Sequence, residues 1–359
     1  MPSQKSISRI TFTALLLAAA TLFSVCWYSG DGSKIPECVL DTSVDRQDAA
    51  IEINPGPRAG TDTGGTDGGK PVAEKRWRFA VVADTRDTEV GFNKAVFPWL
   101  LAAILKEHEK SAIDLILVPG DLVYGAVNAR LEIAAWIEVM RTVYDAGIAV
   151  YPVRGNHDIG CDSSCWNEFF SGSRALPDDG PRDEKGLTYS FSHKNAFFIG
   201  FDNYFSQKVN VNWIQGKLDA NTLPHVFVFS HEPAFAAYHS DCLDDFAEER
   251  DRFWAALGGA GSRVYFCGHD HFYDHARVTD GDRDSSNDIH QFIVGTGGGP
   301  LHSFVPPYPG DNSGMILQQV DHAEAYGYVL VEIDDVKVSL TWMALATGAC
   351  DSWSYRVKR

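Results

Sequence analysis

Short apolar runs alternate with longer amphipathic stretches over most of the chain after Trp77. The apolar runs are rich in β-branched and aromatic residues, which predicts buried strands at 79–83, 115–118, 148–153, 226–229, 264–267 and 292–294. Helical spacing between them predicts helices at 93–108, 131–146 and 244–257, and a closing hairpin is predicted from 328–333 and 337–343. This alternation indicates an α/β fold in which helices cover the strands.

The first 75 residues differ in composition from the rest of the chain. Lys5 and Arg9 precede a nearly unbroken apolar stretch, so residues 1–28 are predicted to be a secretory signal peptide or an uncleaved membrane anchor. Either reading predicts a secreted, periplasmic or cell-surface protein. Residues 29–75 are predicted to be a linker, because the stretch after 54 is dominated by Gly, Pro, Thr and Asp. The folded domain is therefore expected at 76–359, with surface loops at 162–194 and 279–288.

The net charge limits which binding partners are expected, and the number of cysteines indicates the cellular compartment. The formal net charge of −17 disfavours nucleic acids and anionic lipids as partners. Cleavage at or after Cys26 would leave six cysteines, an even number that suits an oxidising compartment. Cys161 and Cys165 are close enough in sequence to form a local disulfide, whereas Cys267, inside an apolar run, is equally explained as a small buried hydrophobic residue.

Polar residues follow five of the predicted strands. These segments are Asp84, then 120–121 (Gly-Asp), then 154–158 (Arg-Gly-Asn-His-Asp), then His231, then 268–271 (Gly-His-Asp-His). The carboxyl ends of strands in an open α/β sheet are where ligands bind, so these side chains are expected to converge. Carboxylate, amide and imidazole groups suit zinc, manganese or iron, and the lack of clustered thiolates in the sequence disfavours a structural zinc site.

Taken in order, these motifs resemble those of the calcineurin-like metallophosphoesterases, and most of all the purple acid phosphatases. The resemblance extends over about 77–343 and includes 120–124 (Gly-Asp-Leu-Val-Tyr) and 155–158 (Gly-Asn-His-Asp). It implies a four-layer αββα sandwich, in which two packed mixed β-sheets are flanked by helices. It also implies a hydrolase of phosphate esters with two metal ions, iron with zinc or manganese, which the N-terminal segment predicts to be exported. The implied metal ligands are Asp84, Asp121, Tyr124, Asn156, His231, His269 and His271.

The resemblance assigns a role to each of these positions. Asp121 would bridge the two ions. Asp84 and His271 would complete the first site, and Asn156, His231 and His269 the second. A hydroxide held between the ions would attack phosphorus in line. His157 would donate a proton to the leaving oxygen, and Asp158 would orient His157.

Arg86 departs from the family pattern, because most of the superfamily has a metal-binding His at this position. A guanidinium that stays protonated cannot bind a metal. Tyr124 matches the tyrosine ligand of purple acid phosphatases and is a possible replacement, although a tyrosine after a strand is also commonly a core residue. For Arg86 two interpretations stay open: it binds substrate phosphate oxygens, or it pairs with a nearby acid such as Asp87.

The expected substrate is a small phosphate monoester, as for acid phosphatases. Two alternatives remain: a phosphodiesterase that uses the same metals, and a non-catalytic exported metal-binding protein in which Arg86 marks a decayed site. Several further residues are candidates for lining the substrate mouth, although ordinary packing or exposure is the simpler explanation for each. These are Trp166, Tyr204, Tyr238, His239 and His302.

Overall fold

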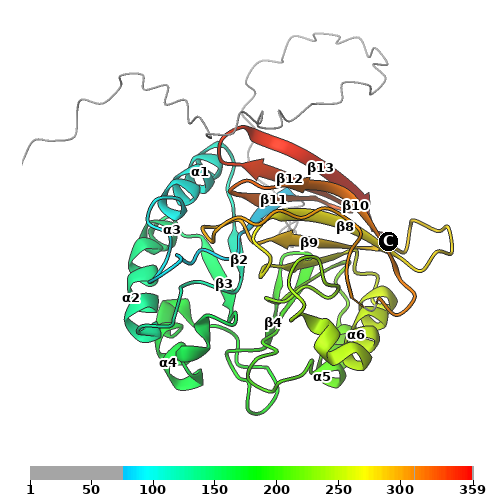
Figure 1. The fold of residues 1–359 in the computed structure, drawn as a ribbon, viewed down its shortest axis with the longest axis horizontal. Coiled ribbons are helices and arrows are strands. Elements are labelled where there is room, and N and C mark those ends of the chain that lie inside the picture. The colour runs from blue at the N-terminus through cyan, green and yellow to red at the C-terminus, as the bar shows by residue number, and fades with distance from the viewer. Residues whose placement is uncertain (1–75, 311, 358–359) are drawn as a thin grey trace, which may run out of the picture. The chain divides into compact units, whose positions relative to one another are not determined.

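Two β-sheets pack face to face and are covered by helices on their outer faces (Figure 1). A computed structural model of the chain describes residues 76–310 and 312–357, so the predicted signal or anchor segment and the linker lie outside the described residues. The first sheet has six strands, in the order β13 (Gly348–Arg356), β12 (Lys337–Ala344), β11 (Gly327–Asp334), β1 (Arg76–Val81), β2 (Leu115–Pro119) and β3 (Ala149–Val153). The second sheet has seven, in the order β10 (Ile316–Ala323), β8 (Tyr273–Thr279), β9 (Ile289–Val294), β7 (Val264–Cys267), β6 (His225–Phe229), β5 (Ala196–Gly200) and β4 (Tyr189–His193).

Helices cover the outer face of each sheet. The first sheet is covered by α1 (Phe97–Lys110), α2 (Ala129–Val139), α3 (Arg141–Asp145) and α4 (Ser163–Phe169). The second is covered by α5 (Val211–Ala220) and α6 (Ala247–Gly259). Short 3-10 turns lie at Asp158–Gly160, Gly172–Arg174 and Leu243–Phe246. The four-layer sandwich implied by the sequence motifs is confirmed.

The alternation of side chains along β1 shows how one strand serves two cores. Phe79 and Val81 point into the core between the two sheets, whereas Ala80, and Val82 directly after the strand, pack in the core beneath the helices of the first sheet. Successive side chains of a strand point to opposite faces, so a strand buried on both sides is apolar throughout. This is why the central strands were recognisable as continuous apolar runs.

The outer elements differ more from the prediction. The predicted helix 131–146 is divided at Met140 into α2 and α3, and the predicted helix 244–257 begins as a 3-10 turn before α6. The loop predicted at 162–194 is wrong in part, because this segment contains α4 and β4. The loop at 279–288 and the hairpin of β11 and β12 are confirmed. Among the described residues, no helix combines the length and apolar character needed to cross a membrane.

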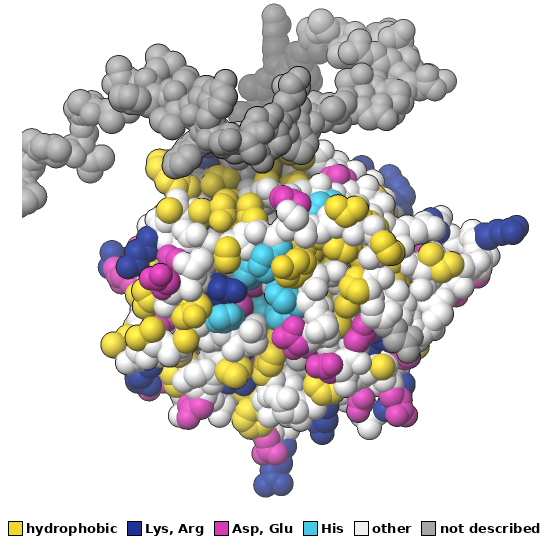
Figure 2. Space-filling model, in the orientation of Figure 1, with side chains coloured by type: hydrophobic (Ala, Val, Ile, Leu, Met, Phe, Trp, Pro, Cys, Tyr) yellow, Lys and Arg dark blue, Asp and Glu magenta, His cyan; other side chains and the backbone are white. Residues whose placement is uncertain are grey.

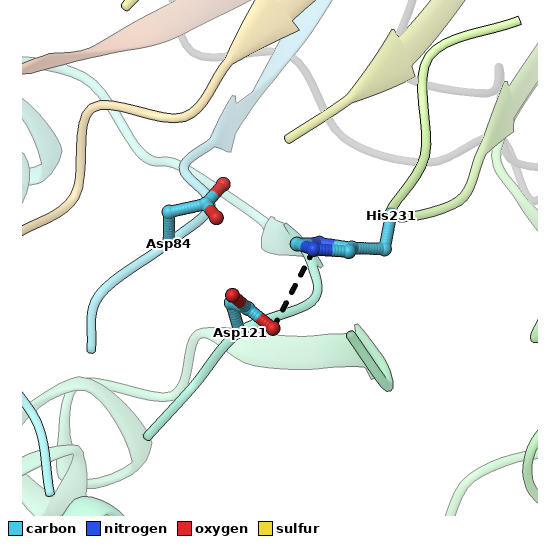
Figure 3. Close-up of side chains that lie close together, drawn as sticks. All are labelled: Asp84, Asp121 and His231. Atoms are coloured by element: carbon cyan, nitrogen blue, oxygen red, sulfur yellow. Dashed lines mark ion pairs between the residues drawn. The ribbon is translucent and has the colours of Figure 1, made fainter. Parts of the chain in front are cut away.

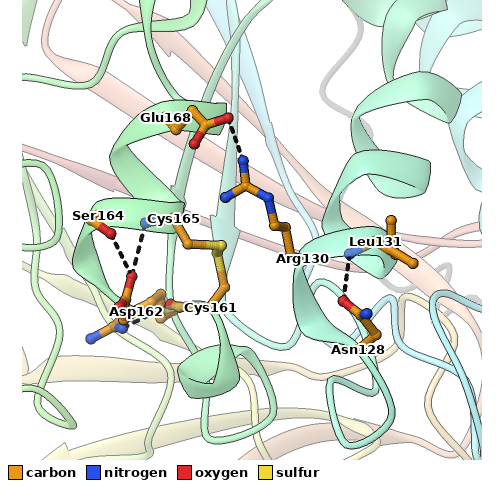
Figure 4. Close-up of a disulfide and its surroundings, with 9 residues drawn as sticks. Asn128, Arg130, Leu131, Cys161, Asp162, Ser164, Cys165 and Glu168 are labelled. Carbon is orange, nitrogen blue, oxygen red and sulfur yellow. Dashed lines mark hydrogen bonds and ion pairs between the residues drawn. A yellow bond between two sulfur atoms is a disulfide. The ribbon is translucent and has the colours of Figure 1, made fainter.

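The predicted disulfide between Cys161 and Cys165 is present, just after β3 (Figure 4). Asp162, between the two cysteines, caps α4 by accepting hydrogen bonds from the Cys165 backbone N–H and the Ser164 hydroxyl, both at 2.9 Å. Cys267 is buried and free, as expected for a small core residue. The disulfide thus fixes the segment that directly follows the loop of His157.

Candidate metal centre

The candidate ligands lie where the carboxyl ends of parallel strands meet at the junction of the two sheets. In the first sheet β1, β2 and β3 are parallel, and in the second β6 and β7 are parallel. Three of the ligands adopt the left-handed backbone conformation, with φ of 56° at Asp84, 54° at Asp121 and 71° at His269. Non-glycine residues in this region cost roughly 1–3 kcal/mol each and cluster at functional sites. The surrounding fold therefore holds these turns in place despite their unfavourable conformational free energy.

Asp84, Asp121 and His231 form the centre of the site (Figure 3). They offer ligand atoms that all lie within 4.8 Å of one another, and the three side chains point toward a common space. All three are buried. The His231 Nε2 lies 3.5 Å from Oδ1 of Asp121. Two carboxylates and an imidazole with this spacing can hold a divalent cation.

Backbone carbonyls orient two of the candidate histidine ligands. Nδ1 of His231 lies 2.9 Å from the carbonyl oxygen of Pro119, and Nδ1 of His271 lies 2.9 Å from that of Pro300. A carbonyl accepts only from a protonated Nδ1, which leaves Nε2 of each ring as the lone-pair donor to a metal. Nε2 of His271 lies 3.4 Å from Oδ1 of Asp84. The tautomer expected of a metal ligand is therefore built into the fold.

Asn156 and His269 lie on the other side of His231. The Asn156 Oδ1 is 3.1 Å from Nε2 of His231, and the His269 ring centroid is 5.1 Å from that of His231. Within the described residues, Nε2 of His269 and Oδ1 of Asp84 are buried and make no hydrogen bond, although each lies in an ion pair, with Asp241 at 3.3 Å and with His271 at 3.4 Å respectively. Buried polar atoms are nearly always satisfied. An ion held by Asp121, Asn156, His231 and His269 would satisfy Nε2 of His269, so these donors fit a metal ion at the second of the two positions that the resemblance implies.

Glycines allow the loops to approach these ligands closely. A Cβ at Gly120 would lie 2.5 Å from Nδ1 of His231, and a Cβ at Gly268 would lie 2.2 Å from Oδ2 of Asp84. No side chain tolerates such contacts, so both positions require glycine. Both are the glycines of the motifs singled out in the sequence.

The charges within the site influence one another. Burial acts to raise the pKa of Asp84, but His231, His271 and Arg86 together hold that pKa below its usual value. Burial opposes protonation of His269, yet the ion pair of its Nε2 with the Asp241 carboxylate and the charge of Asp270 raise its pKa to about 9. The pKa of each of these groups therefore depends on its charged neighbours in the site.

Arg86 points into the site and is mostly buried. Its Nε lies 3.2 Å from Oδ2 of Asp121, and its Nη2 lies 3.3 Å from Nε2 of His271. The guanidinium also donates through Nη1 to the backbone carbonyl of Asp87, at 3.1 Å. Its acidic partner is thus the predicted bridging ligand Asp121.

His157 lies over the site and is partly buried. Its backbone N–H donates to Oδ1 of Asp121 at 3.0 Å, and its Nδ1 lies 2.7 Å from the carbonyl oxygen of Tyr124. Burial lowers the pKa of His157. The Tyr124 ring lies beside His157, with ring centroids 5.2 Å apart. Metal binding by Tyr124 stays a prediction.

Asp158 is buried beneath the loops that carry Asp121 and His157. Its carboxylate accepts from the backbone N–H groups of Leu122 at 3.1 Å, Val123 at 3.3 Å and Gly155 at 2.9 Å. Burial, reinforced by the charge of Asp121, raises the pKa of Asp158 well above its usual value. The structure thus places Asp158 under the two loops, while the ring of His157 is oriented by the carbonyl of Tyr124.

A family model decides the assignment of the chain. The model of the calcineurin-like phosphoesterases matches residues 78–273, a span that contains all the predicted site residues. The chain belongs to the calcineurin-like phosphoesterase family. A comparison with curated proteins found no significant match.

Solved structures share the fold of this phosphoesterase. Purple acid phosphatase PPD1 from yellow lupin has a TM-score of 0.59 and 14% identity, over 78% of this chain and 54% of the lupin chain. GAP50, the anchor in the inner membrane complex of Plasmodium, has a TM-score of 0.56 and 15% identity, over 80% of this chain and 90% of GAP50. A dimetal phosphatase from Danio rerio has a TM-score of 0.53 and 15% identity, over 79% of this chain and 99% of its own. This chain thus spans about half the length of the lupin enzyme.

The surroundings of the centre include residues that the motifs do not identify. Asp241 lies on the loop after β6, with Oδ1 3.3 Å from Nε2 of His269. His239 lies 2.6 Å from the carboxylate of Asp270, and the His302 ring stacks on that of His271 at 4.7 Å. The patch of histidine side chains is visible near the middle of the face in Figure 2, with a Lys or Arg side chain at its edge.

The residues considered for the substrate mouth differ in exposure, so only some of them can contact a substrate. Tyr238 is half-exposed and stacks on His302, with centroids 4.4 Å apart, and His239 is adjacent to it. Trp166 is fully buried in the core under α2 and α4, so it cannot reach a substrate. The Tyr204 ring lies 6.1 Å from that of His231.

Proposed function

We propose that this phosphoesterase hydrolyses small phosphate monoesters at a metal centre built on Asp121. The observation that supports this most directly is the buried group of Asp84, Asp121 and His231, whose ligand atoms all lie within 4.8 Å of one another. The lupin and Danio rerio structures of similar fold carry the names of phosphatases, which is in keeping with this activity.

The ligands proposed for an ion at the second position are Asp121, Asn156, His231 and His269. The resemblance assigns Asp84, Asp121, His271 and Tyr124 to the first position, and iron, zinc and manganese all suit this mixture of carboxylate, amide, imidazole and phenol donors. A bound ion supplies Lewis-acid polarisation of the phosphoryl group and acidifies water. The fold supplies the orientation of the ligands through the carbonyls of Pro119 and Pro300.

His157 is proposed to donate a proton to the leaving oxygen. The carbonyl of Tyr124 engages its Nδ1, so Nε2 is the ring nitrogen available for proton transfer. The backbone of His157 is held by Asp121, which fixes the distance between the proton donor and the metal ligands. Asp158 acts as a positioning residue by fixing the loops on which both residues lie.

Export to the periplasm, the cell surface or the medium is part of the proposal. It is supported by the apolar N-terminal segment and by the disulfide of Cys161 and Cys165, because disulfides persist in oxidising compartments. The net charge of −17 favours a small phosphate ester over nucleic acid as the partner. N-terminal membrane anchoring remains part of the expectation for 1–28.

Hydrolysis of p-nitrophenyl phosphate tests the activity. Turnover by the metal-loaded protein is expected to fall at least a hundredfold in Asn156→Ala and His269→Ala, while His193→Ala, which removes a histidine from the far end of β4, serves as the matched control. Undiminished turnover in both site variants would rule out the metal assignment. A higher rate with bis-p-nitrophenyl phosphate would identify a phosphodiesterase instead. Metal binding without hydrolysis of either ester would identify a non-catalytic protein.

A further inference from the structure

A positively charged side chain, Arg86, lies among the residues that would bind a metal ion at the first position. Oδ2 of Asp121 and Nε2 of His271 are two of the atoms that would face an ion there, and both lie within 3.3 Å of guanidinium nitrogens of Arg86. Since Nδ1 of His271 is engaged by the carbonyl of Pro300, the contact with Arg86 uses the ring nitrogen that a metal would need.

We infer that Arg86 occupies the first metal position, so that this phosphoesterase binds one metal ion, at the second position. The inference rests on the proposed function for its catalytic meaning, but the number of ions bound is independent of turnover. A guanidinium does not lose its proton in proteins, so the position holds a permanent positive charge. A divalent ion would have to displace that charge and take over its partners.

Several contacts hold Arg86 in place. The backbone N–H of Arg86 donates to the carbonyl of Asp121 at 3.2 Å, and Arg86 forms an isolated β-bridge with Phe92. The side chain is 13% exposed, and each of its three nitrogens makes a contact within the loop region or the site. An arginine held at Nε, Nη1 and Nη2 does not behave as a freely moving surface side chain.

The carboxylate of Asp121 shows how the two positions are divided. Its Oδ2 faces Arg86, whereas its Oδ1 lies 3.5 Å from Nε2 of His231, on the side of the second position. Asp121 thus bridges a guanidinium and the second metal position. In the family pattern, the same carboxylate would bridge two metal ions. The described contacts of Asn156 and of the His231 and His269 rings do not involve Arg86. The second position therefore retains its complete set of donors.

Arg86 can also serve the substrate in this place. A guanidinium carries five N–H donors, so N–H groups remain after its three contacts. Facing the phosphoryl group, they would bind its oxygens by charge-assisted hydrogen bonds. One of the two interpretations of the sequence was that Arg86 binds phosphate. If Arg86 occupies the first metal position, it can do so from there.

Metal stoichiometry of the full chain tests the inference. The protein is stripped with a chelator, reloaded with Mn²⁺, desalted and measured by elemental analysis and by EPR. The wild type is expected to bind one Mn²⁺ per chain with an uncoupled signal. Arg86→His, which restores an imidazole at this position, is expected to bind two ions with an exchange-coupled signal.

The reciprocal variants keep the inference testable if Arg86→His does not fold. His271→Ala is expected to retain one ion, whereas His269→Ala is expected to lose it. Two ions in the wild type, falling to one in His271→Ala, would overturn the inference, and so would a wild type that binds none. A protein that binds one ion and hydrolyses no phosphate ester would refute the proposed activity and leave the stoichiometry intact.

Discussion

A Cβ at Gly155 would lie 2.1 Å from Oδ1 of Asp121 and 2.5 Å from the Asp121 backbone nitrogen. The loop after β3 therefore rests directly against the carboxylate that is central to the site. We expect Gly155→Ala to displace Asp121, to reduce metal binding and turnover at least tenfold, and to lower the free energy of unfolding by about 1–3 kcal/mol. Metal titration and urea unfolding measure these effects.

Gly216, in the middle of α5, is the matched control. A Cβ there meets no atom within 4 Å, so Gly216→Ala should leave activity unchanged and stabilise the protein by about 0.5–1 kcal/mol through the helix. Normal turnover in Gly155→Ala would show that the loops can separate without moving Asp121.

Asp158→Asn tests whether this carboxylate acts through the backbone. Three N–H groups point at its two oxygens, and an asparagine would turn an NH₂ group toward some of them. A loss of about 1–3 kcal/mol in unfolding free energy is expected together with reduced turnover. Asp162→Asn, at the exposed N-cap of α4, should cost about 1 kcal/mol or less. Full stability with abolished turnover would instead favour a direct chemical role for Asp158.

We expect His290 to make the stability of the fold decrease at acidic pH. Burial, followed by the charge of neighbouring His275, lowers the pKa of His290 to about 2, and the two rings lie 2.7 Å apart at Nε2 and Nδ1. In the unfolded chain this histidine takes up a proton below about pH 6.5, whereas in the folded chain it stays neutral. Its stabilising contribution is therefore complete above pH 6.5 and is lost as the pH falls, at up to about 1.4 kcal/mol per pH unit.

His290→Asn removes the titrating ring and keeps a polar atom toward His275. Urea midpoints between pH 7 and pH 4.5 should decline less steeply in the variant than in the wild type, even if the variant is less stable at pH 7. Equal slopes for the two proteins would show that His290 does not titrate as described.

Tyr124 gives an optical test of the first metal position. A phenolate bound to ferric iron absorbs visible light, and the sequence resemblance implies such a ligand. With Arg86 in that position, the iron-loaded wild type is expected to be colourless, and Tyr124→Phe should retain its metal stoichiometry and most of its turnover. An absorption spectrum decides this. A visible band that disappears in Tyr124→Phe would place a ferric ion beside Tyr124 and contradict the role inferred for Arg86.

The sequence revealed the ligands that directly follow buried strands. Asp84, Asp121 and His231 were predictable because each comes within three residues of a strand that is apolar on both faces. Asp241 was not, because it lies on a long loop well beyond the end of β6, where no periodicity indicates its direction. Strands β4, β5, β8, β10 and β13 were also missed; β10, for example, buries none of its side chains and mixes apolar and polar residues.

The contacts of the Arg86 side chain could not be predicted from the sequence either. An arginine has a long, flexible side chain, and its sequence position allowed contacts with substrate phosphate oxygens or with a nearby acid such as Asp87. Only the fold brings His271, from the second sheet, within 3.3 Å of the guanidinium.

The ligands of the proposed ion come from both halves of the sandwich: Asp121 and Asn156 follow strands of the first sheet, and His231 and His269 follow strands of the second. An ion bound there cross-links the two sheets, and every tenfold excess of free ion over its dissociation constant adds about 1.4 kcal/mol to the unfolding free energy. Metal starvation would then shorten the lifetime of the protein against proteases, so the supply of the ion would govern how much of the folded protein survives.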